Sequence, residues 1–181
     1  ERLSIANMTT EWGALAGVFP IDEITINWLN ARAKFVAERG LEGVASDIDG
    51  NGIHPRMNKN RIEQLIKNKN YFKADNDAFY TKKIELDLST IEPHISGPNT
   101  VKVMSPVSEA MKKKIKINKA YLVSCVNSRV DDISEAAKIL RGNKIAEGVS
   151  FYIAAASSEV QNEAEKRGDW KAIIDAGAIP L

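Results

Sequence analysis

Cysteine is almost absent from this sequence, since Cys125 is the only one in 181 residues. A single cysteine cannot form an internal disulfide, so the chain is not a disulfide-rich secreted domain and fits a reducing compartment or the inside of a mitochondrion. Histidine is scarce too. His54 and His94 both lie in loop-like segments, which makes a cysteine–histidine nucleophile a poor alternative. Cys125 alone also cannot make a zinc or iron–sulfur site, because such sites need three or four ligands.

Neither charge sign dominates the sequence. The 25 Lys and Arg residues nearly balance 24 Asp and Glu, and the net charge of +1 gives no long-range field that would gather nucleic acid. The basic run at 111–119 has no aromatic residue for base stacking, so we predict a solvated face and no nucleic-acid partner. No apolar run approaches the roughly 20 residues of a membrane span, and no membrane partner is expected. The chain begins at Glu1 without an initiator methionine, so we expect it to be part of a longer one.

Two helices are predicted near the amino terminus, the first over residues 3–16. Four apolar residues recur there at helical spacing and form one stripe: Ile5, Met8, Trp12 and Leu15. Asn7 and Glu11, four residues apart, then share a different face, and from geometry alone the simpler interpretation is a solvent-facing pair. The second helix follows the cap Asp22 and ends at Gly40.

Residues 41–82 are predicted to form a loop followed by one or two modest helices. The segment DIDGNG at 47–52 imitates a calcium loop, with oxygen ligands at the expected positions and a glycine at the turn. The last ligand position of such a loop is Asn58 in place of glutamate, so we predict a surface turn without calcium. Short strands are predicted over 83–88, where polar and apolar residues alternate, and a domain boundary is expected near residue 90.

The last third of the chain alternates strands with helices. Buried strands are predicted over 120–125 and 149–155. Three helices are expected from capping residues and glycine stops. The first is opened by Ser128 with Asp131 and ended by Gly142, and the second is opened by Ser158 with Gln161 and ended by Gly168. The third is capped by Asp169 and ended by Gly177. This order predicts an α/β fold with neighbouring parallel strands. Cys125 falls at the carboxyl end of the first strand, where open sheets bind ligands, although a lone buried cysteine is more often an inert small hydrophobe.

Two segments resemble the signatures of a known family. SIANMTTEWGALAGVFP at 4–20 is similar to an aconitase superfamily signature in which an Asn-Met pair precedes a glutamate. VSCVNSR at 123–129 resembles the Ser-Cys-Thr-Asn-Ser segment of that superfamily, with valine in place of threonine. LSTIEPHISGPN at 88–99 and EGVSFYIAAASS at 147–158 are similar to its fungal homoaconitase branch. The resemblance covers essentially the whole chain and is weakest over 41–82.

The resemblance implies a three-layer α/β/α fold of the aconitase type, with parts of two adjacent domains in this chain. Residues 1–90 would be the end of one domain, with a helical insertion over about 41–82, and residues 91–181 the start of the next. It also implies a 4Fe-4S cluster held by three cysteines in the full-length protein, with Cys125 as the first ligand. The other two cysteines of such proteins lie beyond this chain, so no cluster and no activity are expected of the chain alone.

By the same resemblance, Glu11 is the active-site carboxylate and Asn7 its amide neighbour. Four polar residues beside the cysteine are inferred to hold its loop: Ser124, Asn127, Ser128 and Arg129. The implied activity is that of a hydro-lyase acting on a tricarboxylate, hydrating cis-homoaconitate reversibly to homoisocitrate in lysine biosynthesis by the α-aminoadipate route. The implied setting is the mitochondrial matrix, for a monomeric protein. Aconitase activity, 3-isopropylmalate isomerase activity and a non-catalytic structural or RNA-contacting role stay open as alternatives.

Overall fold

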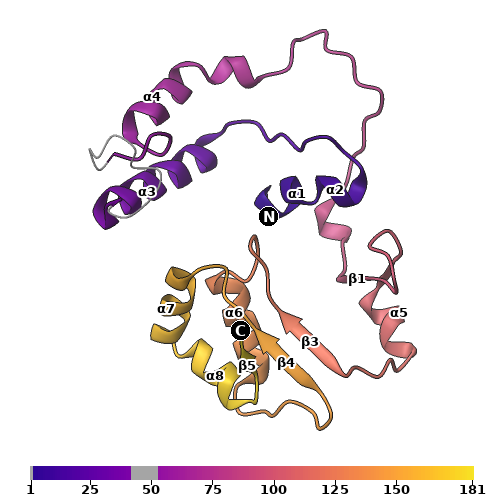
Figure 1. The fold of residues 1–181 in the computed structure, drawn as a ribbon. Coiled ribbons are helices and arrows are strands. Elements are labelled where there is room, and N and C mark those ends of the chain that lie inside the picture. Colours follow the sequence, from indigo (N-terminus) through magenta and orange to yellow (C-terminus); the bar gives the residue numbers. More distant parts are fainter. Residues whose placement is uncertain (1, 42–52) are drawn as a thin grey trace. The chain divides into compact units, whose positions relative to one another are not determined.

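The computed structural model describes residues 2–41 and 53–181, which fall into two compact units (Figure 1). One unit combines the chain up to Gly17 with Asp87–Leu181, and the other is Val18–Leu86. None of the helices in the described residues combines the length and the apolar character that a membrane crossing requires. The assignment of aconitase-type domains to residues 1–90 and 91–181 stays a prediction.

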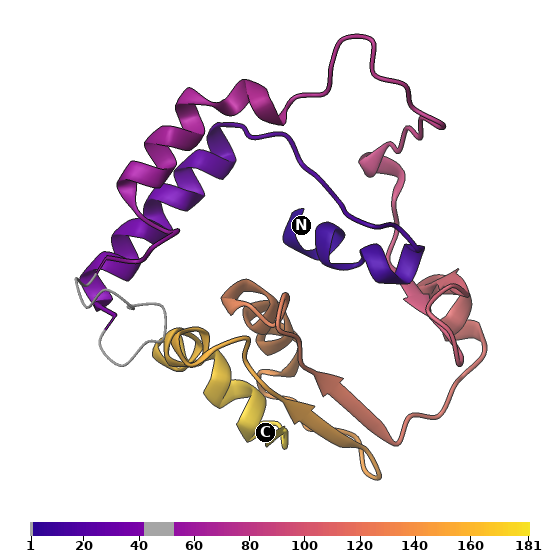
Figure 2. The ribbon, with the colours of Figure 1, turned by 45° about the horizontal axis from the view of Figure 1, so that its top comes forward.

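The unit Val18–Leu86 is built on a pair of helices that lie side by side in both views (Figures 1 and 2). Its helical elements are α3 (Glu23–Arg39), α4 (Lys59–Lys67) and the 3-10 helix η1 (Lys69–Phe72). The predicted ends of α3 are confirmed: Asp22 Oδ1 accepts the Thr25 N–H at 2.9 Å, and Gly40 ends the helix at φ 78°. The expected modest helices after the loop are likewise confirmed by α4 and η1.

The calcium-like segment DIDGNG at 47–52 lies outside the described residues. The last ligand position of such a loop, Asn58, caps α4, because its Oδ1 accepts the Arg61 N–H at 3.0 Å.

The strands predicted over 83–88 are wrong, because the structure forms no strand there. Asp87 Oδ1 accepts the Ser89 N–H at 2.9 Å and opens a short 3-10 helix instead. The elements that follow are η2 (Leu88–Thr90), β1 (His94–Ser96), β2 (Met104–Pro106) and α5 (Val107–Lys112). β1 and β2 pair antiparallel. Alternation alone does not make a strand when no partner strand supplies hydrogen bonds.

The carboxyl-terminal part is a parallel sheet with helices packed on it, which confirms the α/β class (Figure 1). Its strands, in sheet order, are β3 (Lys119–Leu122), β4 (Ser150–Ile153) and β5 (Ile179–Pro180). The helices between them are α6 (Val130–Leu140), α7 (Ser158–Lys166) and α8 (Asp169–Asp175). The two predicted strands are therefore parallel neighbours, whereas the two-residue β5 was not predicted because it is too short to show a pattern.

One face of this sheet carries the core. Ile153 on β4 is fully buried together with Ile133 of α6 and Ile173 of α8. Because side chains alternate along a strand, Tyr121 and Tyr152 lie on the other face, where their rings stack with centroids 5.0 Å apart. The helical layer and the core thus hold β3 and β4 from one side and fix where the strands end.

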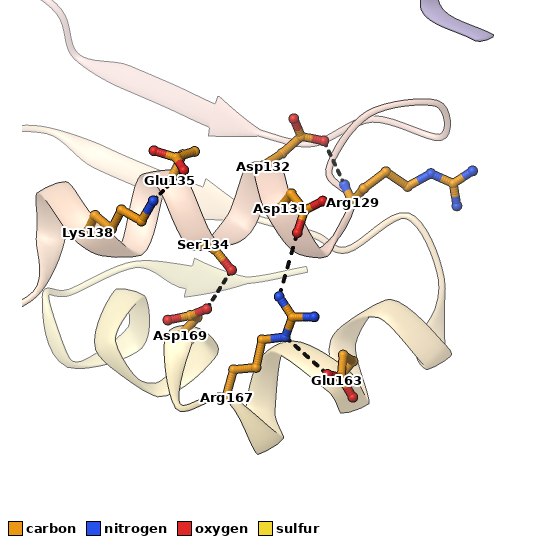
Figure 3. Close-up of polar contacts among 9 residues, drawn as sticks. All are labelled: Arg129, Asp131, Asp132, Ser134, Glu135, Lys138, Glu163, Arg167 and Asp169. Atoms are coloured by element: carbon orange, nitrogen blue, oxygen red, sulfur yellow. Dashed lines mark hydrogen bonds and ion pairs between the residues drawn. The ribbon is translucent and has the colours of Figure 1, made fainter. Parts of the chain in front are cut away.

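Polar contacts tie the three helices together around Asp169 (Figure 3). Its carboxylate accepts from Ser134 Oγ at 2.6 Å and pairs with Arg141 at 2.8 Å, joining α8 to α6. Arg167 bonds Glu163 at 3.0 Å and faces Asp131 at 3.6 Å, and these carboxylates raise the pKa of its guanidinium. The predicted capping role of Asp169 is wrong, because Gly168 precedes the helix and Asp169 is its first residue.

The other two predicted caps are also displaced by one residue. Ser157, rather than Ser158, caps α7 by accepting the Val160 N–H at 3.3 Å. At α6 the cap is Arg129 rather than Ser128, and its N–H donates to Asp132 Oδ2 at 2.9 Å (Figure 3). Two consecutive polar residues stand at the start of each of these helices, and only the backbone angles decide which of the two is the N-cap.

Candidate functional site

The cysteine loop, residues 123–129, joins β3 to α6 at the carboxyl end of the parallel sheet. Cys125 lies three residues beyond Leu122 and is exposed to solvent. Its predicted place at this edge of the sheet is confirmed, although β3 ends earlier than predicted. A buried, inert cysteine is therefore the wrong interpretation.

Ser124 shapes the loop around the cysteine. Its Oγ accepts the N–H of Val126 at 3.1 Å and that of Asn127 at 2.9 Å, so the chain folds back over one serine side chain. A second anchor is the Ser128 carbonyl, which accepts the Ala156 N–H at 3.1 Å from the loop after β4. Cys125 is thereby held between two fixed points on the backbone.

Ser128 has an unusual conformation and an unusual environment. Its φ of 54° lies in the left-handed region that residues other than glycine seldom adopt, and its side chain is only 2% exposed. The Oγ atom is buried without a hydrogen-bond partner among the described residues. Left-handed backbone here turns the chain into α6, which is why Arg129 and not Ser128 serves as the cap.

The helix predicted over 3–16 is interrupted. The chain forms α1 (Arg2–Asn7) and α2 (Thr9–Trp12), separated at Met8, and stops at Gly13 with φ 73°. Glycine favours the left-handed stop at position 13. The shared face of Asn7 and Glu11 stays a prediction, whereas a solvent-facing pair is wrong for Glu11, whose Oε2 is buried. Asn7 is exposed, and Glu11 is partly buried.

A hydrogen bond that the sequence did not reveal connects the amino-terminal signature segment, residues 4–20, with the cysteine loop. Ser4 Oγ on α1 donates to Asn127 Oδ1 in the cysteine loop at 2.7 Å, across 123 residues of chain. Both segments belong to the same compact unit. The contact therefore brings the helix region that carries Asn7 and Glu11 to the loop that carries Cys125.

Comparison with protein families identifies the family to which the chain with these two segments belongs. The model described as Aconitase family (aconitate hydratase) matches residues 1–181. The chain belongs to the aconitase family. Its resemblance to that superfamily is thus confirmed over its whole length, with the signature residues at both ends of the Ser4–Asn127 hydrogen bond.

Individual members of the aconitase family are about half identical to the chain. It is 51% identical over 181 residues to "Homoaconitase, mitochondrial" of Mycosarcoma maydis and 52% identical over 180 residues to the protein of that name of Debaryomyces hansenii. These matches cover 100% and 99% of this chain but 24% of each relative. The chain therefore spans about a quarter of the length of the curated relatives it matches.

The aconitase family suggests a 4Fe-4S cluster, and the exposed thiol of Cys125 has the chemistry of one ligand to such a cluster. Two buried side-chain oxygens in the described residues lack a hydrogen-bond partner, Glu11 Oε2 and Ser128 Oγ, and both belong to the predicted site. A buried polar atom without a partner is costly unless something else satisfies it. No group of three or more potential metal ligands occurs among residues 2–41 and 53–181, and Cys125 is a free, exposed thiol.

Proposed function

We propose that this chain is part of a homoaconitase, a hydro-lyase that reversibly hydrates cis-homoaconitate to homoisocitrate in the lysine pathway of the mitochondrial matrix. The observation that carries the proposal is the 51% identity over 181 residues to a protein named mitochondrial homoaconitase. The exposed thiol of Cys125 at the edge of the sheet supports it, because a ligand position must be open to the group that it binds.

In this proposal Cys125 holds one corner of a 4Fe-4S cluster as a thiolate, with two further cysteines from other parts of the full-length protein. When bound, the cluster supplies a Lewis-acid iron that polarises the substrate. Ser124 limits the movement of the loop, since its Oγ accepts two amide N–H groups on the far side of the cysteine. Restricting the ligand loop in this way preserves coordination geometry.

Glu11 is proposed as the carboxylate that holds or moves a proton. Its Oε2 is buried and has no partner among the described residues, so it is free to bond with a substrate hydroxyl or to accept a proton. The Ser128 hydroxyl is a second uncommitted donor. Arg129 is exposed at the start of α6, and its guanidinium suits a carboxylate of a tricarboxylic acid.

The test of substrate class is an assay of the anaerobically purified full-length protein with three unsaturated substrates: cis-homoaconitate, cis-aconitate and isopropylmaleate. Loss of the double bond is followed by ultraviolet absorbance. The proposal predicts the highest kcat/KM for cis-homoaconitate, and a higher value for either competitor contradicts it.

The test of the carboxylate is Glu11→Gln in the full-length protein. We expect kcat to fall by about a hundredfold or more, the usual contribution of a positioned acid or base. The matched control is Glu147→Gln in the exposed loop before β4, which should leave kcat unchanged. Equal activity of the two variants would remove Glu11 from the proposed chemistry.

A further inference from the structure

We propose that Ser4 is a positioning residue, which locks the cysteine loop through its hydrogen bond to Asn127. The proposal rests on the proposed function, because it concerns the same loop and the cluster that Cys125 is proposed to hold. It adds a residue with no assigned role and explains how two segments far apart in sequence act on one site.

The geometry of the Ser4–Asn127 contact supports a role for Ser4 in restricting the movement of the cysteine loop. Ser4 Oγ donates to Asn127 Oδ1 at 2.7 Å, the usual distance for a hydroxyl donor. The Asn127 N–H donates to Ser124 Oγ at 2.9 Å, so one residue is held at its backbone by the loop and at its side chain by α1. Cys125 lies between the two residues of this loop bond, Ser124 and Asn127.

Within the described part of the chain, few other contacts hold the cysteine loop in place. Cys125 lies beyond the last β3 ladder pair, Leu122 with Ile153, and before the first turn of α6, so neither element fixes it directly. The Ser124 turn joins the Ser124 Oγ to the N–H groups of Val126 and Asn127 inside the loop, and the Ser128 carbonyl accepts the Ala156 N–H from the loop after β4. Ser4 is the residue that fixes the loop from α1.

The consequence is a coupling between the loop and the carboxylate region. α1 ends at Asn7, and Met8 N–H donates to the Ser4 carbonyl at 3.1 Å, so Ser4 is part of the turn that leads to Glu11. If the bond to Asn127 is lost, the loop opens more often and α1 loses its attachment to it. Breaking one such bond allows local opening about fivefold more often.

The first test is amide hydrogen exchange of the full-length apo protein, compared with Ser4→Ala. We expect exchange at Val126 and Asn127 to become about fivefold faster, while core amides such as Ile153 keep their wild-type rate and show that the protein is folded. Ser4→Thr retains the hydroxyl and should restore the slow rate. Unchanged exchange at Val126 and Asn127 in Ser4→Ala overturns the proposal.

The matched control is Ser108→Ala in the same unit. Ser108 Oγ donates to Glu92 Oε2 at 3.2 Å, so the variant also removes an exposed serine–side-chain hydrogen bond, but one away from the cysteine loop. It should leave exchange at Val126 and Asn127 unchanged. Equal acceleration by Ser4→Ala and Ser108→Ala would show a general loosening and would overturn the specific role of Ser4.

The second test uses the reconstituted full-length protein and follows cluster loss to a chelator by visible absorbance. Ser4→Ala should bleach about fivefold faster than wild type, Ser4→Thr and Ser108→Ala at the wild-type rate. Faster exchange with unchanged bleaching would contradict the positioning role. Failure of the wild-type protein to take up a cluster would instead contradict the proposed function, and the exchange test would still decide whether Ser4 locks the loop.

Discussion

The Ser128 side chain is buried with a hydroxyl that has no partner among the described residues. A buried hydroxyl without a hydrogen bond costs about 1–3 kcal/mol. Ser128→Ala should therefore stabilise this chain by about 1 kcal/mol in urea unfolding. Ser134→Ala, which removes the 2.6 Å bond to Asp169, should destabilise it by about the same amount. Loss of stability in both variants would mean that the Ser128 hydroxyl is already satisfied.

Asp87 carries a carboxyl whose pKa is shifted by hydrogen bonds that the structure shows. The Ser89 hydroxyl at 2.7 Å, and then the Ser89 N–H, lower the pKa of this exposed carboxyl from its ordinary value of 3.8. The lowered pKa means that the turn at η2 is stabilised above pH 3.8 and loses this stabilisation as the pH falls through the folded-state value.

A carboxyl titration by NMR tests this turn. Ser89→Ala should move the Asp87 pKa upward towards its ordinary value, because it removes the largest cause of the shift. Thr90→Val removes a hydroxyl that bonds the Asp87 carbonyl and not its carboxylate, so the pKa should stay low. A low pKa that persists in Ser89→Ala would contradict the assigned cause.

Helix α6 carries the core on one side and solvent on the other. Ile133 is fully buried, whereas Ile139 on the same helix is 73% exposed. Ile133→Ala should lower the free energy of unfolding by about 2–4 kcal/mol, because it removes buried apolar surface and leaves a cavity. Ile139→Ala makes the same chemical change and should alter the stability by less than about 0.5 kcal/mol. Similar losses in urea unfolding would place the wrong face of α6 in the core.

The N-cap of α7 is Ser157 in the structure and Ser158 in the sequence-based prediction. Ser157 caps the helix through Val160, so Ser157→Ala should cost about 1 kcal/mol, and Ser158→Ala should cost little. The predicted assignment required the opposite order, and urea unfolding of the two variants distinguishes them.

Element type was predictable where the pattern repeats over several turns or where a cap is unambiguous. Asp22 and Gly40 mark α3 because neither neighbour of Asp22, Ile21 or Glu23, is a preferred N-cap and no other glycine or asparagine adjoins Gly40. At Ser128 and Ser157 adjacent polar residues can both cap, and only φ and ψ choose between them. No local signal marks the break at Met8, and the missing strands over 83–88 depend on a partner strand that a local pattern does not show.

The site residues were predictable by resemblance, but their arrangement was not. Ser4 lies 123 residues from Asn127, and no periodicity links positions so far apart. The left-handed φ of Ser128 was equally hidden, because serine rarely adopts it. The position of Cys125 followed from physics, since a strand followed by a helix places the connecting loop at the carboxyl edge of a parallel sheet.

For the whole molecule, the central claim is that Cys125 is one of three cluster ligands, with the others outside this chain. The chain contains one cysteine, so reconstitution with iron and sulfide under anaerobic conditions should leave it colourless. A stable stoichiometric cluster on the 181-residue chain would overturn this division of ligands.

The most direct measurement is the iron and acid-labile sulfide content of the full-length protein after anaerobic reconstitution, compared between wild type and Cys125→Ser. The account predicts about four irons per wild-type chain, with the brown colour of a 4Fe-4S cluster, and loss of most of that iron in Cys125→Ser because a third of the protein ligands is removed. An undiminished iron and sulfide content in Cys125→Ser would contradict the assignment of Cys125 as a cluster ligand.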